Sequence, residues 1–368
     1  MSTDKKNILK QYDVCIFGFS EKEEGGRSWM IRTGLAENGI NITSCRTDAD
    51  GFIAKYHDLY KKWKSLTGNI DALYVVFMGY YLMPLAWYIT RRRKIPVILD
   101  AFVSQYDTEV TDRKRISRYS PRAWFLWVVD FISCFMADVI VVDTIGHKDF
   151  FKKNFFVNEK KIIVVPIGCR SDVFVPTLKS ERPDDKFIIE FHGSFIPLQG
   201  IEYIMEAAQI LQEKDKDIYF IIIGKGQTFD EMTRLVQKFR LLNIEFFGTI
   251  PQKDIPGYIA RAHICLGIFG KTEKALRVIP NKVYECLSCG KAVITERSPA
   301  ALEMLRDREE VLMVVPGNST DLAEKILELK ENSTLRIHLE KGARAISLNK
   351  FSTYETVKSL VAWIKLQS

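Results

Sequence analysis

Short apolar runs alternate with longer amphipathic stretches along almost the whole chain. This alternation is typical of buried parallel strands that are separated by helices. The fold class that it predicts is α/β, with two successive strand–helix arrays that form two Rossmann-like, doubly wound domains. The strands are expected at residues 12–19, 40–45, 72–78, 97–100, 139–142 and 161–165, and again at 187–191, 218–223, 244–248, 264–268, 292–295 and 311–315.

A polar, proline-bearing stretch at residues 170–185 interrupts the alternation and predicts a domain boundary. We expect an N-terminal domain over residues 1–172 and a C-terminal domain over residues 183–350. The chain of 368 residues exceeds one ordinary α/β core, which agrees with two domains. A last amphipathic helix, within 353–368, needs an apolar surface to pack on.

The charge is distributed unevenly between the two halves. The net charge is +7, and residues 1–172 hold 26 Lys and Arg against 20 Asp and Glu. A basic N-terminal half suits an anionic membrane surface or a phosphorylated substrate, and a solvated surface without a partner is the alternative. The composition, with 47% hydrophobic and 27% charged residues, is that of a globular protein.

Two apolar stretches, 72–89 and 123–142, are long enough to be compared with a membrane span. Gly79 and Pro84 divide the first into a strand and a helix. Asp130 and Asp138 are costly in lipid, so the second is expected to be an amphipathic helix followed by a strand. We therefore expect no transmembrane segment, and the polar N-terminus has no signal-peptide core.

An aromatic stripe occupies one side of that second helix. Trp124, Trp127 and Phe131 follow each other at helical spacing. We expect this stripe to pack in the core of the N-terminal domain, and a membrane-facing stripe is the alternative. The alternative would make the protein peripheral on the inner face of the membrane.

The seven cysteines are scattered and odd in number, which favours a reducing, cytoplasmic compartment. Cys286 and Cys289 form a C-x-x-C pair, but no second pair completes a zinc site. Residues three apart on a helix share a face, so we expect packing thiols here and not a redox pair. No metal site is expected, because the chain also lacks a carboxylate motif such as D-x-D.

The strongest functional pattern lies at residues 277–295, which read RVIPNKVYECLSCGKAVIT. The pattern predicts a loop, a short helix, a glycine turn and a strand. Helix N-termini at a sheet edge bind anions through unpaired N–H groups and the helix dipole. Arg277 and Lys282 add positive charge there, Asn281 can fix the loop or a phosphate oxygen, and Glu285 can hold sugar hydroxyls. The stretch therefore predicts a nucleotide-sugar pocket.

A second group of polar residues follows strands of the N-terminal half. Ligands of open α/β sheets bind at the carboxyl ends of strands, so these residues are candidates for the acceptor side. Ordinary loop polarity and a structural histidine are the alternatives. The glycine-rich loop after the first strand lacks G-x-G-x-x-G spacing, which leaves a dinucleotide site unsupported. The candidates are Gly25, Gly26 and Arg27, then Asp100, Tyr106, Asp107, Arg113 and His147.

Four stretches of the second half, taken together, resemble the family 4 glycosyltransferases, which are retaining enzymes of the GT-B fold. They read HGSFIPLQGIEYIMEAA at 192–208, IIIGKGQ at 221–227, FFGTIPQKDIPGYIARAHICLGIF at 246–269 and PNKVYECLSCGKAVIT at 280–295. The resemblance implies two domains that face each other across a cleft, with the last helix crossing back onto the N-terminal domain. It implies transfer of a sugar from a nucleoside-diphosphate sugar to a glycan, lipid-linked or small-molecule acceptor, with no cofactor or obligatory metal.

The resemblance also implies which residues contact the donor. In the family's E-x7-E pair, the second glutamate holds the ribose, and Glu285 matches it. The departing phosphate takes the acceptor's proton in this family, which would explain why no general base stands out; Asp100, Asp107 and His147 would orient the acceptor. Together with the residues selected from the sequence itself, the donor-binding candidates are Gly193, Ser194, Phe195, Gly200, Lys225, Gly226 and Asn281.

This chain departs from the family pattern at three charged positions. Arg277 replaces the first glutamate of the pair, and Ser194 and Gln199 replace an arginine and a lysine that contact the diphosphate. Charge-assisted hydrogen bonds contribute roughly 1.5–3 kcal/mol each. We infer that phosphate neutralisation has moved to Arg277 and Lys282, with Lys225 as a third candidate.

Three other interpretations stay open. The chain could be a GT-B nucleotide-sugar epimerase, which rearranges the donor without a second substrate. It could be a non-catalytic sugar-nucleotide-binding subunit of a glycan assembly complex, or it could have lost donor binding. The expected partners are a nucleotide sugar, a glycan or lipid-linked acceptor and a membrane surface, and no nucleic acid.

Overall fold

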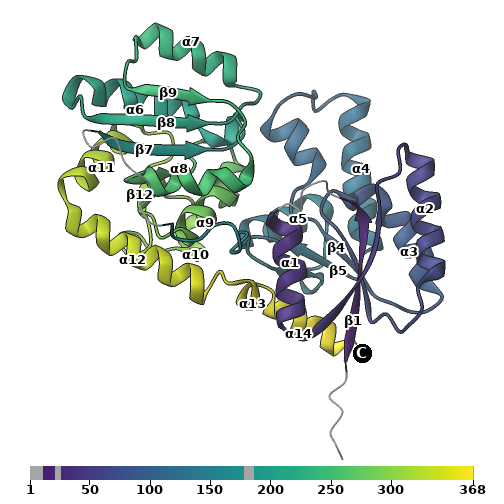
Figure 1. The fold of residues 1–368 in the computed structure, drawn as a ribbon. Helices are drawn as coiled ribbons and strands as arrows, with labels where there is room; N and C mark the ends of the chain where they lie inside the picture. Colours follow the sequence, from purple (N-terminus) through teal and green to yellow (C-terminus); the bar gives the residue numbers. More distant parts are fainter. Residues whose placement is uncertain (1–10, 21–25, 178–185, 368) are drawn as a thin grey trace, which may run out of the picture.

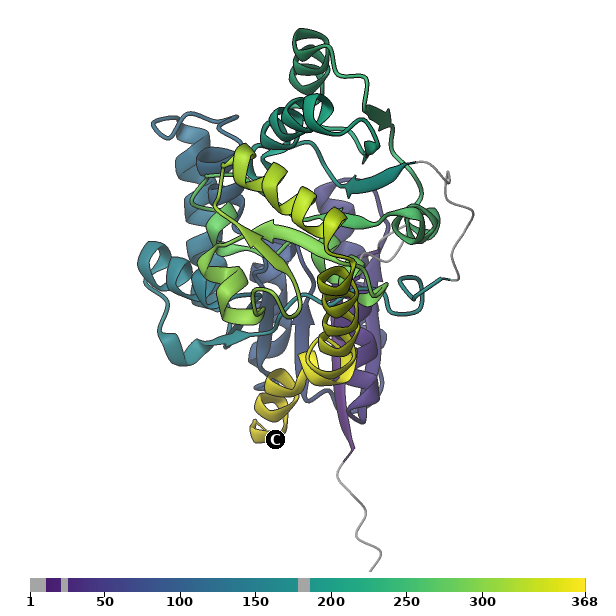
Figure 2. The same cartoon turned by 90° about the vertical axis from the view of Figure 1, so that its left-hand side faces the viewer.

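The computed structural model describes residues 11–20, 26–177 and 186–367. Two α/β domains lie side by side, and each is built on one six-stranded parallel sheet (Figure 1). In Figure 2 the C-terminal domain faces the viewer and the N-terminal domain lies behind it. The α/β fold class with two Rossmann-like domains is confirmed.

The N-terminal sheet has the strand order β2-β1-β3-β4-β5-β6. Its inner strands β3, β4 and β5 are short and buried throughout, because helices cover both faces. The helices α2 to α5 cover one face, and α1 covers the other. The elements are β1 (Tyr12–Phe19), α1 (Gly26–Glu37), β2 (Ile40–Thr47), α2 (Phe52–Ser65), β3 (Ala72–Val75), α3 (Met83–Arg91), β4 (Val97–Asp100), α4 (Pro121–Met136), β5 (Val139–Val142), α5 (Ile145–Phe155) and β6 (Ile162–Val164).

The C-terminal sheet has the order β12-β11-β10-β7-β8-β9, which is the Rossmann order read from its other edge. Helices again cover both faces, with α6 and α11 on one side and α8, α9 and α10 on the other. The strands are β7 (Phe187–His192), β8 (Ile218–Ile223), β9 (Ile244–Phe247), β10 (Ile264–Leu266), β11 (Val293–Glu296) and β12 (Leu312–Val314). The helices are α6 (Ile201–Lys214), α7 (Phe229–Phe239), α8 (Ile255–Arg261), α9 (Asn281–Ser288), α10 (Pro299–Met304), α11 (Ser319–Glu331) and α12 (Ser333–Asn349).

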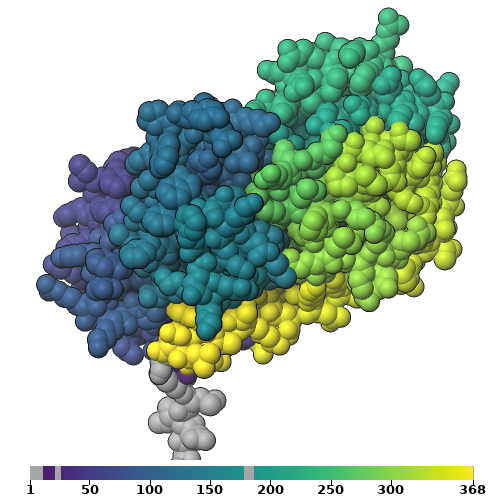
Figure 3. All heavy atoms as spheres, turned by 180° about the vertical axis from the view of Figure 1, so that it is seen from behind, coloured from purple at the N-terminus to yellow at the C-terminus, as the bar shows by residue number. Residues whose placement is uncertain are grey.

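The chain returns to the N-terminal domain at its end. Seen from behind, the yellow C-terminal segment runs from one domain across to the other (Figure 3). The apolar side of α14 (Lys358–Leu366) buries Leu360 and Ile364 against the same face that α1 covers. The helix α13 (Thr353–Thr356) also packs closely on α1. A Cβ on Gly34 of α1 would lie 2.3 Å from the carbonyl oxygen of Thr353, so only glycine leaves room for this contact.

Doubly wound sheets bind ligands where the strand order reverses, at the carboxyl ends of the strands. In the C-terminal sheet this point lies between β7 and β10, and in the N-terminal sheet it lies between β1 and β3. The segments that follow β3, β4 and β7 all reach the cavity between the domains. The topology thus brings both reversal points to one site.

Two local expectations are wrong. Gly26 and Arg27 form the first residues of α1 and not a loop before it. In the expected core stripe of α4, Trp124 is 66% exposed, whereas Trp127 and Phe131 pack against the core. The helix turns its first tryptophan outward because Ala123, Leu126 and Asp130 occupy its buried side.

Among the described residues, no helix combines the length and apolar character that crossing a membrane requires. All seven cysteines are buried free thiols. Burial raises the pKa of Cys286 well above its ordinary value and that of Cys289 as well, so both stay protonated.

Candidate functional site

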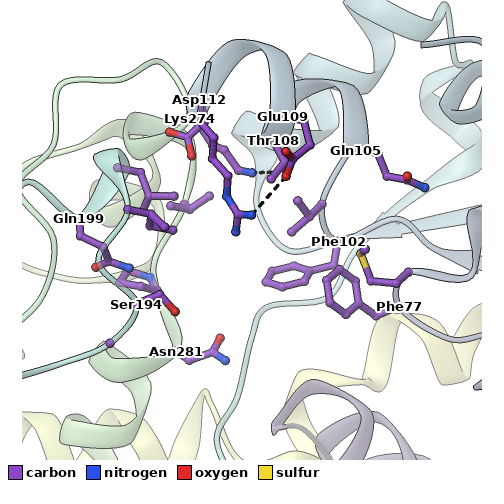
Figure 4. A pocket seen from close by; sticks show the side chains of 18 of the residues that line it. Phe77, Phe102, Gln105, Thr108, Glu109, Asp112, Ser194, Gln199, Lys274 and Asn281 are labelled. Atoms are coloured by element: carbon purple, nitrogen blue, oxygen red, sulfur yellow. Dashed lines mark hydrogen bonds and ion pairs between the residues drawn. The ribbon is translucent and has the colours of Figure 1, made fainter. Parts of the chain in front are cut away.

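A cavity of about 840 Å³ lies between the two domains. Figure 4 shows its two sides, with Ser194, Gln199 and Asn281 facing Phe77 and Phe102 across the open space. The first three come from the loop after β7 and from the start of α9, and the two phenylalanines come from the segments after β3 and β4. The cavity is therefore a shared site that neither domain forms alone.

The helix α9 begins at the wall of this cavity. Pro280 precedes it, and no side chain caps its first amides. Asn281, Lys282 and Glu285 line the cavity from the first turns of the helix. Uncapped N–H groups and the helix dipole favour an anion at this point. The structure thus brings together three of the residues that the sequence selects.

Lys282 is almost completely buried beside the loop after β7, at 4% exposure. Its Nζ lies 3.7 Å from the ring centroid of Phe191 and donates to Oε1 of Gln199. Gly193, with φ of 150°, makes room for it, because a Cβ there would lie 2.9 Å from Nζ. Burial lowers the pKa of Lys282 to about 7, so an anionic ligand would restore its charge.

Glu285 belongs to a buried row of charges. Nε2 of His192 lies 2.8 Å from Oε2 of Glu285, and Nδ1 lies 2.8 Å from Oε1 of Glu190. Burial lowers the pKa of His192, but the charges and hydrogen bonds of the two glutamates outweigh it and raise the pKa to about 10. The imidazolium therefore donates from both nitrogens and fixes the carboxylate of Glu285 at the cavity wall.

Two of these residues, Glu190 and His192, are of types that bind metal ions, and Cys286 lies beside them. Glu190, His192 and Cys286 are the one group among the described residues whose ligand atoms lie within 4.8 Å of one another. Both nitrogens of His192 are occupied by carboxylates, and the thiol of Cys286 is held protonated. A metal ion needs a free imidazole nitrogen and a thiolate. The geometry fits a protonated histidine between two carboxylates better than it fits a metal ion.

Arg277 lies outside the lining of the large cavity. Its Nη2 lies 2.9 Å from both carboxylate oxygens of Asp107, and its guanidinium stacks 4.4 Å from the ring centroid of Phe150. Its backbone oxygen accepts from Thr144 Oγ1 at 2.7 Å. The guanidinium of Arg277 is therefore ion-paired with Asp107 of the N-terminal domain and does not line the cavity where the phosphate is expected.

Arg277 ends a segment that ties the two domains together. Thr272 Oγ1 donates to Oδ1 of Asp112 at 3.1 Å, and Nζ of Lys274 donates to Thr108 at 2.7 Å. Both acceptors lie in η2 (Asp107–Asp112), a π-helical turn. Burial lowers the pKa of Lys274, and this lysine also lines the cavity. The domain interface and the cavity rim are therefore the same polar cluster, as Figure 4 shows at its upper edge.

The acceptor-side candidates separate into two buried pairs. Nε of Arg27 lies 2.9 and 3.0 Å from the carboxylate oxygens of Asp100, and His147 contacts Asp143 through Nδ1. None of these four residues lines the cavity, and neither does Gly26. Arg27 supports the wall indirectly, because its guanidinium lies 4.9 Å from the ring centroid of Phe102. Gly25 lies outside the described residues.

Two donor candidates of the loop after β7, Gly193 and Phe195, already use their amides within the domain. The N–H of Gly193 donates to Ile223 and that of Phe195 donates to Lys225. The side chain of Phe195 is wholly buried. The residue between them, Ser194, is exposed and lines the cavity. The anion position therefore depends on Ser194 and the start of α9 more than on the loop's other amides.

Two other donor candidates, Gly200 and Gly226, act through packing. Gly200, with φ of 63°, touches the backbone at Gly270, where a Cβ would lie 2.5 Å from the amide nitrogen. A Cβ on Gly226 would lie 2.5 Å from the carbonyl oxygen of Phe195. Lys225 is exposed beside Phe229, and none of these three residues lines the cavity.

Sequence reasoning missed several residues of the wall. His192 precedes the selected glycine by one position, and an ionisable side chain at the end of a buried strand was the available signal. Lys274 and Asp112 gave no such signal, since only the domain contact brings them to the cavity. Arg113, selected as a loop candidate, does line it, whereas Tyr106 does not. Further apolar lining residues are Met78, Tyr81, Val103, Ile116 and Leu126.

The second half of the chain matches a known family. Residues 178–346 match the family described as Glycosyl transferases group 1. An uncharacterized glycosyltransferase of Methanocaldococcus jannaschii is 30% identical over 44% of this chain and 43% of its own length. The lipopolysaccharide core biosynthesis glycosyltransferase LpsE of Rhizobium meliloti is 21% identical over 90% of this chain and 93% of its own length. The chain thus spans less than half the length of the first of these relatives.

Solved structures match the fold over the whole chain. HepE of Anabaena, in complex with UDP and glucose, superposes with a TM-score of 0.68 at 14% identity and covers 97% of this chain and 100% of its own. Sucrose-phosphate synthase of Thermosynechococcus elongatus gives the same TM-score, identity and coverage. At such identities the likeness concerns the fold alone. The protein therefore has the GT-B fold of two Rossmann-like domains, and its residues 178–346 are similar to the group 1 glycosyltransferases.

Proposed function

We propose that this protein is a retaining glycosyltransferase that moves a sugar from a nucleoside-diphosphate sugar to a glycan, lipid-linked or small-molecule acceptor. One observation carries the proposal: the uncapped start of α9, with Lys282 and Glu285, opens into the cavity between the two domains. A cavity of about 840 Å³ has the size of a site for a nucleotide sugar and part of an acceptor.

The leaving diphosphate is the group that most needs stabilisation, because it departs with its negative charge. We assign it to the amides at the start of α9, to Lys282 and to the hydroxyl of Ser194. Asn281 would hold a phosphate oxygen or the loop. Glu285 would accept hydrogen bonds from the ribose hydroxyls, and His192 keeps that carboxylate in place.

In this proposal Arg277 holds the two domains together through its ion pair with Asp107. Its side chain would reach a diphosphate only by giving up Asp107, since the two are ion-paired outside the cavity lining. The departing phosphate itself would take the acceptor's proton. The acceptor would lie against the wall formed by Phe77, Phe102 and Arg113.

The first test is a thermal-shift screen with UDP, GDP, ADP and their sugars. A ligand that binds the native state raises the melting temperature, and the HepE complexes make uridine nucleotides the first choice. Glu285→Ala should lose most of this shift, whereas Glu324→Ala, on the exposed side of α11, should keep it. The anomeric configuration of the product, measured by NMR, then tests retention.

Two results would overturn the assignment. If no nucleotide raises the melting temperature, the cavity is not a nucleotide site. If Glu285→Ala binds and turns over its donor as the wild type does, the site lies elsewhere. Release of a rearranged donor without any acceptor would instead favour an epimerase.

We also propose a cytoplasmic location, with peripheral association at the inner face of the membrane. The seven buried free thiols support a reducing compartment. A cell fractionation that finds the protein in an oxidising compartment would contradict this proposal.

A further inference from the structure

The helix α4 exposes an apolar stripe to solvent. Trp124, Phe125 and Phe135 are 66%, 55% and 77% exposed, and Val128 and Ile132 lie between them at 37% and 39%. At about 100° per residue, these positions fall within roughly a third of the helix circumference. The opposite side of the helix is buried in the domain. Contiguous exposed apolar surface of this kind marks an interaction site.

The neighbouring helix also exposes aromatic residues. The helix α3 packs beside α4 and exposes Trp87 at 37% and Tyr88 at 61%. Figure 1 shows α4 and α3 on the side of the N-terminal domain that α2 also covers. We call this surface the α3–α4 face and define it by Trp87, Tyr88, Trp124, Phe125, Val128, Ile132 and Phe135.

Positive charges predominate around the α3–α4 face. Arg91 ends α3, Arg92, Arg93 and Lys94 follow it, and all four are exposed. The guanidinium of Arg91 lies 4.6 Å from the ring centroid of Trp87, so the cations border the aromatic residues directly.

The start of α4 adds further cations. Arg118 and Arg122 are exposed at or just before its first turn. Within residues 83–94 and 117–138, all of them described, the acidic residues are Asp130, which is buried, and Asp138, which lies beyond the end of α4 and accepts a hydrogen bond from the amide of Val97.

We propose that the α3–α4 face docks on an anionic lipid bilayer. Tryptophan and tyrosine favour the boundary between headgroups and acyl chains, and exposed cations attract anionic headgroups. A helix with an apolar stripe and a basic border lies on such a surface without crossing it. A second copy of the chain fits this face poorly, because two-fold pairing would bring two cationic borders together.

The orientation that follows brings the cavity close to the bilayer. The ring of Tyr81, which lines the cavity, stacks on Phe125 at 6.3 Å between centroids. Arg122 also lines the cavity and is exposed at the start of α4. Docking gives the proposed membrane association a defined surface, and because it requires no sugar transfer it stands or falls separately from the proposed glycosyl transfer.

The test is flotation of the full chain with vesicles of phosphatidylcholine alone or mixed with phosphatidylglycerol, without any nucleotide. We expect binding to the mixed vesicles and its loss at high salt. Trp124→Ser with Phe135→Ser should lower the vesicle partition coefficient at least about tenfold. The matched control, Leu242→Ser with Ile337→Ser, removes exposed apolar residues of the C-terminal domain and should bind as the wild type does.

A second set of variants tests whether the cations that border the α3–α4 face contribute to binding. Arg91→Glu with Arg92→Glu should lower the partition coefficient by about fivefold or more per residue. Arg234→Glu with Lys253→Glu, exposed on the C-terminal domain, should leave it unchanged. Circular dichroism and thermal unfolding check that each variant is folded.

Three outcomes would overturn the proposal. One is a folded wild-type chain that does not float with phosphatidylglycerol vesicles. Another is equal loss of binding in the control variants. The third is a dimer or an acidic protein partner, seen by sedimentation, that the α4 variant loses while vesicle binding stays unchanged.

Discussion

Nε2 of His192, at the end of β7, lies 2.8 Å from Oε2 of Glu285, one turn into α9. The same imidazole is held from its other side by Glu190, whose Oε2 has no hydrogen-bond partner. Three buried charges in a row carry a net charge of minus one next to the proposed ribose position. The histidine is thus a positioning residue for Glu285, because both of its ring nitrogens are held by carboxylates.

We expect His192→Ala to weaken donor binding by roughly tenfold to a hundredfold, since it removes a charge-assisted hydrogen bond. It should also lower the free energy of unfolding by about 3–5 kcal/mol, because two carboxylates lose their buried partner. His192→Gln, whose amide can still donate to Glu285, should recover part of the affinity. The measurements are KM and kcat for the donor and chemical denaturation.

The control for this experiment is Glu245→Gln, an exposed glutamate on β9. A folded His192→Ala variant with wild-type KM would show that Glu285 does not depend on the imidazole.

The pair of Arg277 and Asp107 makes a second prediction, through a double-mutant cycle. Arg277→Ala and Asp107→Ala should each lower turnover, and the double variant should be little worse than either, because all three lose the same domain contact. Nucleotide affinity should change by less than about threefold in each. If Arg277 instead binds the diphosphate, Arg277→Ala alone should lose affinity and Asp107→Ala should not.

The lowered pKa of Lys282 predicts how donor affinity depends on pH. Its pKa of about 7 in the free protein should rise when a diphosphate binds beside it. Below pH 7 the lysine is already charged, so affinity should be flat. Above pH 7 binding must take up a proton, so affinity should fall by up to about tenfold per pH unit.

Calorimetry of the donor in buffers of different ionisation enthalpy, at a pH above 7, should detect this proton uptake. Lys282→Arg keeps its charge at every pH and should lose the pH dependence. A wild-type affinity that stays constant from pH 7 to pH 9 would contradict the prediction.

A fourth prediction compares two glycines, Gly200 and Gly257, that differ in how closely they are packed. Gly200→Ala should be destabilising by several kcal/mol, because its φ is 63° and its Cβ would lie 2.5 Å from the backbone of Phe269 and Gly270. Gly257→Ala, within α8 and with nothing inside 4 Å, should instead stabilise the protein by up to about 1 kcal/mol. Thermal unfolding of the two variants gives the comparison, and equal melting temperatures would contradict it.

The sequence by itself determined the α/β class and the two parallel sheets, because buried strands leave apolar runs that need no long-range information. It also selected Lys282, Glu285 and Asn281, since a helix start after a loop is a local feature with a local chemistry. The structure brings these three to one cavity wall.

The tertiary structure decided what each charge faces. Arg277 looks like a phosphate ligand along the chain, yet Asp107, 170 positions away, takes its guanidinium. Trp124 shares the spacing of a core stripe, but the register of α4 against its sheet turns it outward. Partners across a domain interface and the rotation of a helix depend on contacts between distant segments, which spacing along the chain does not encode.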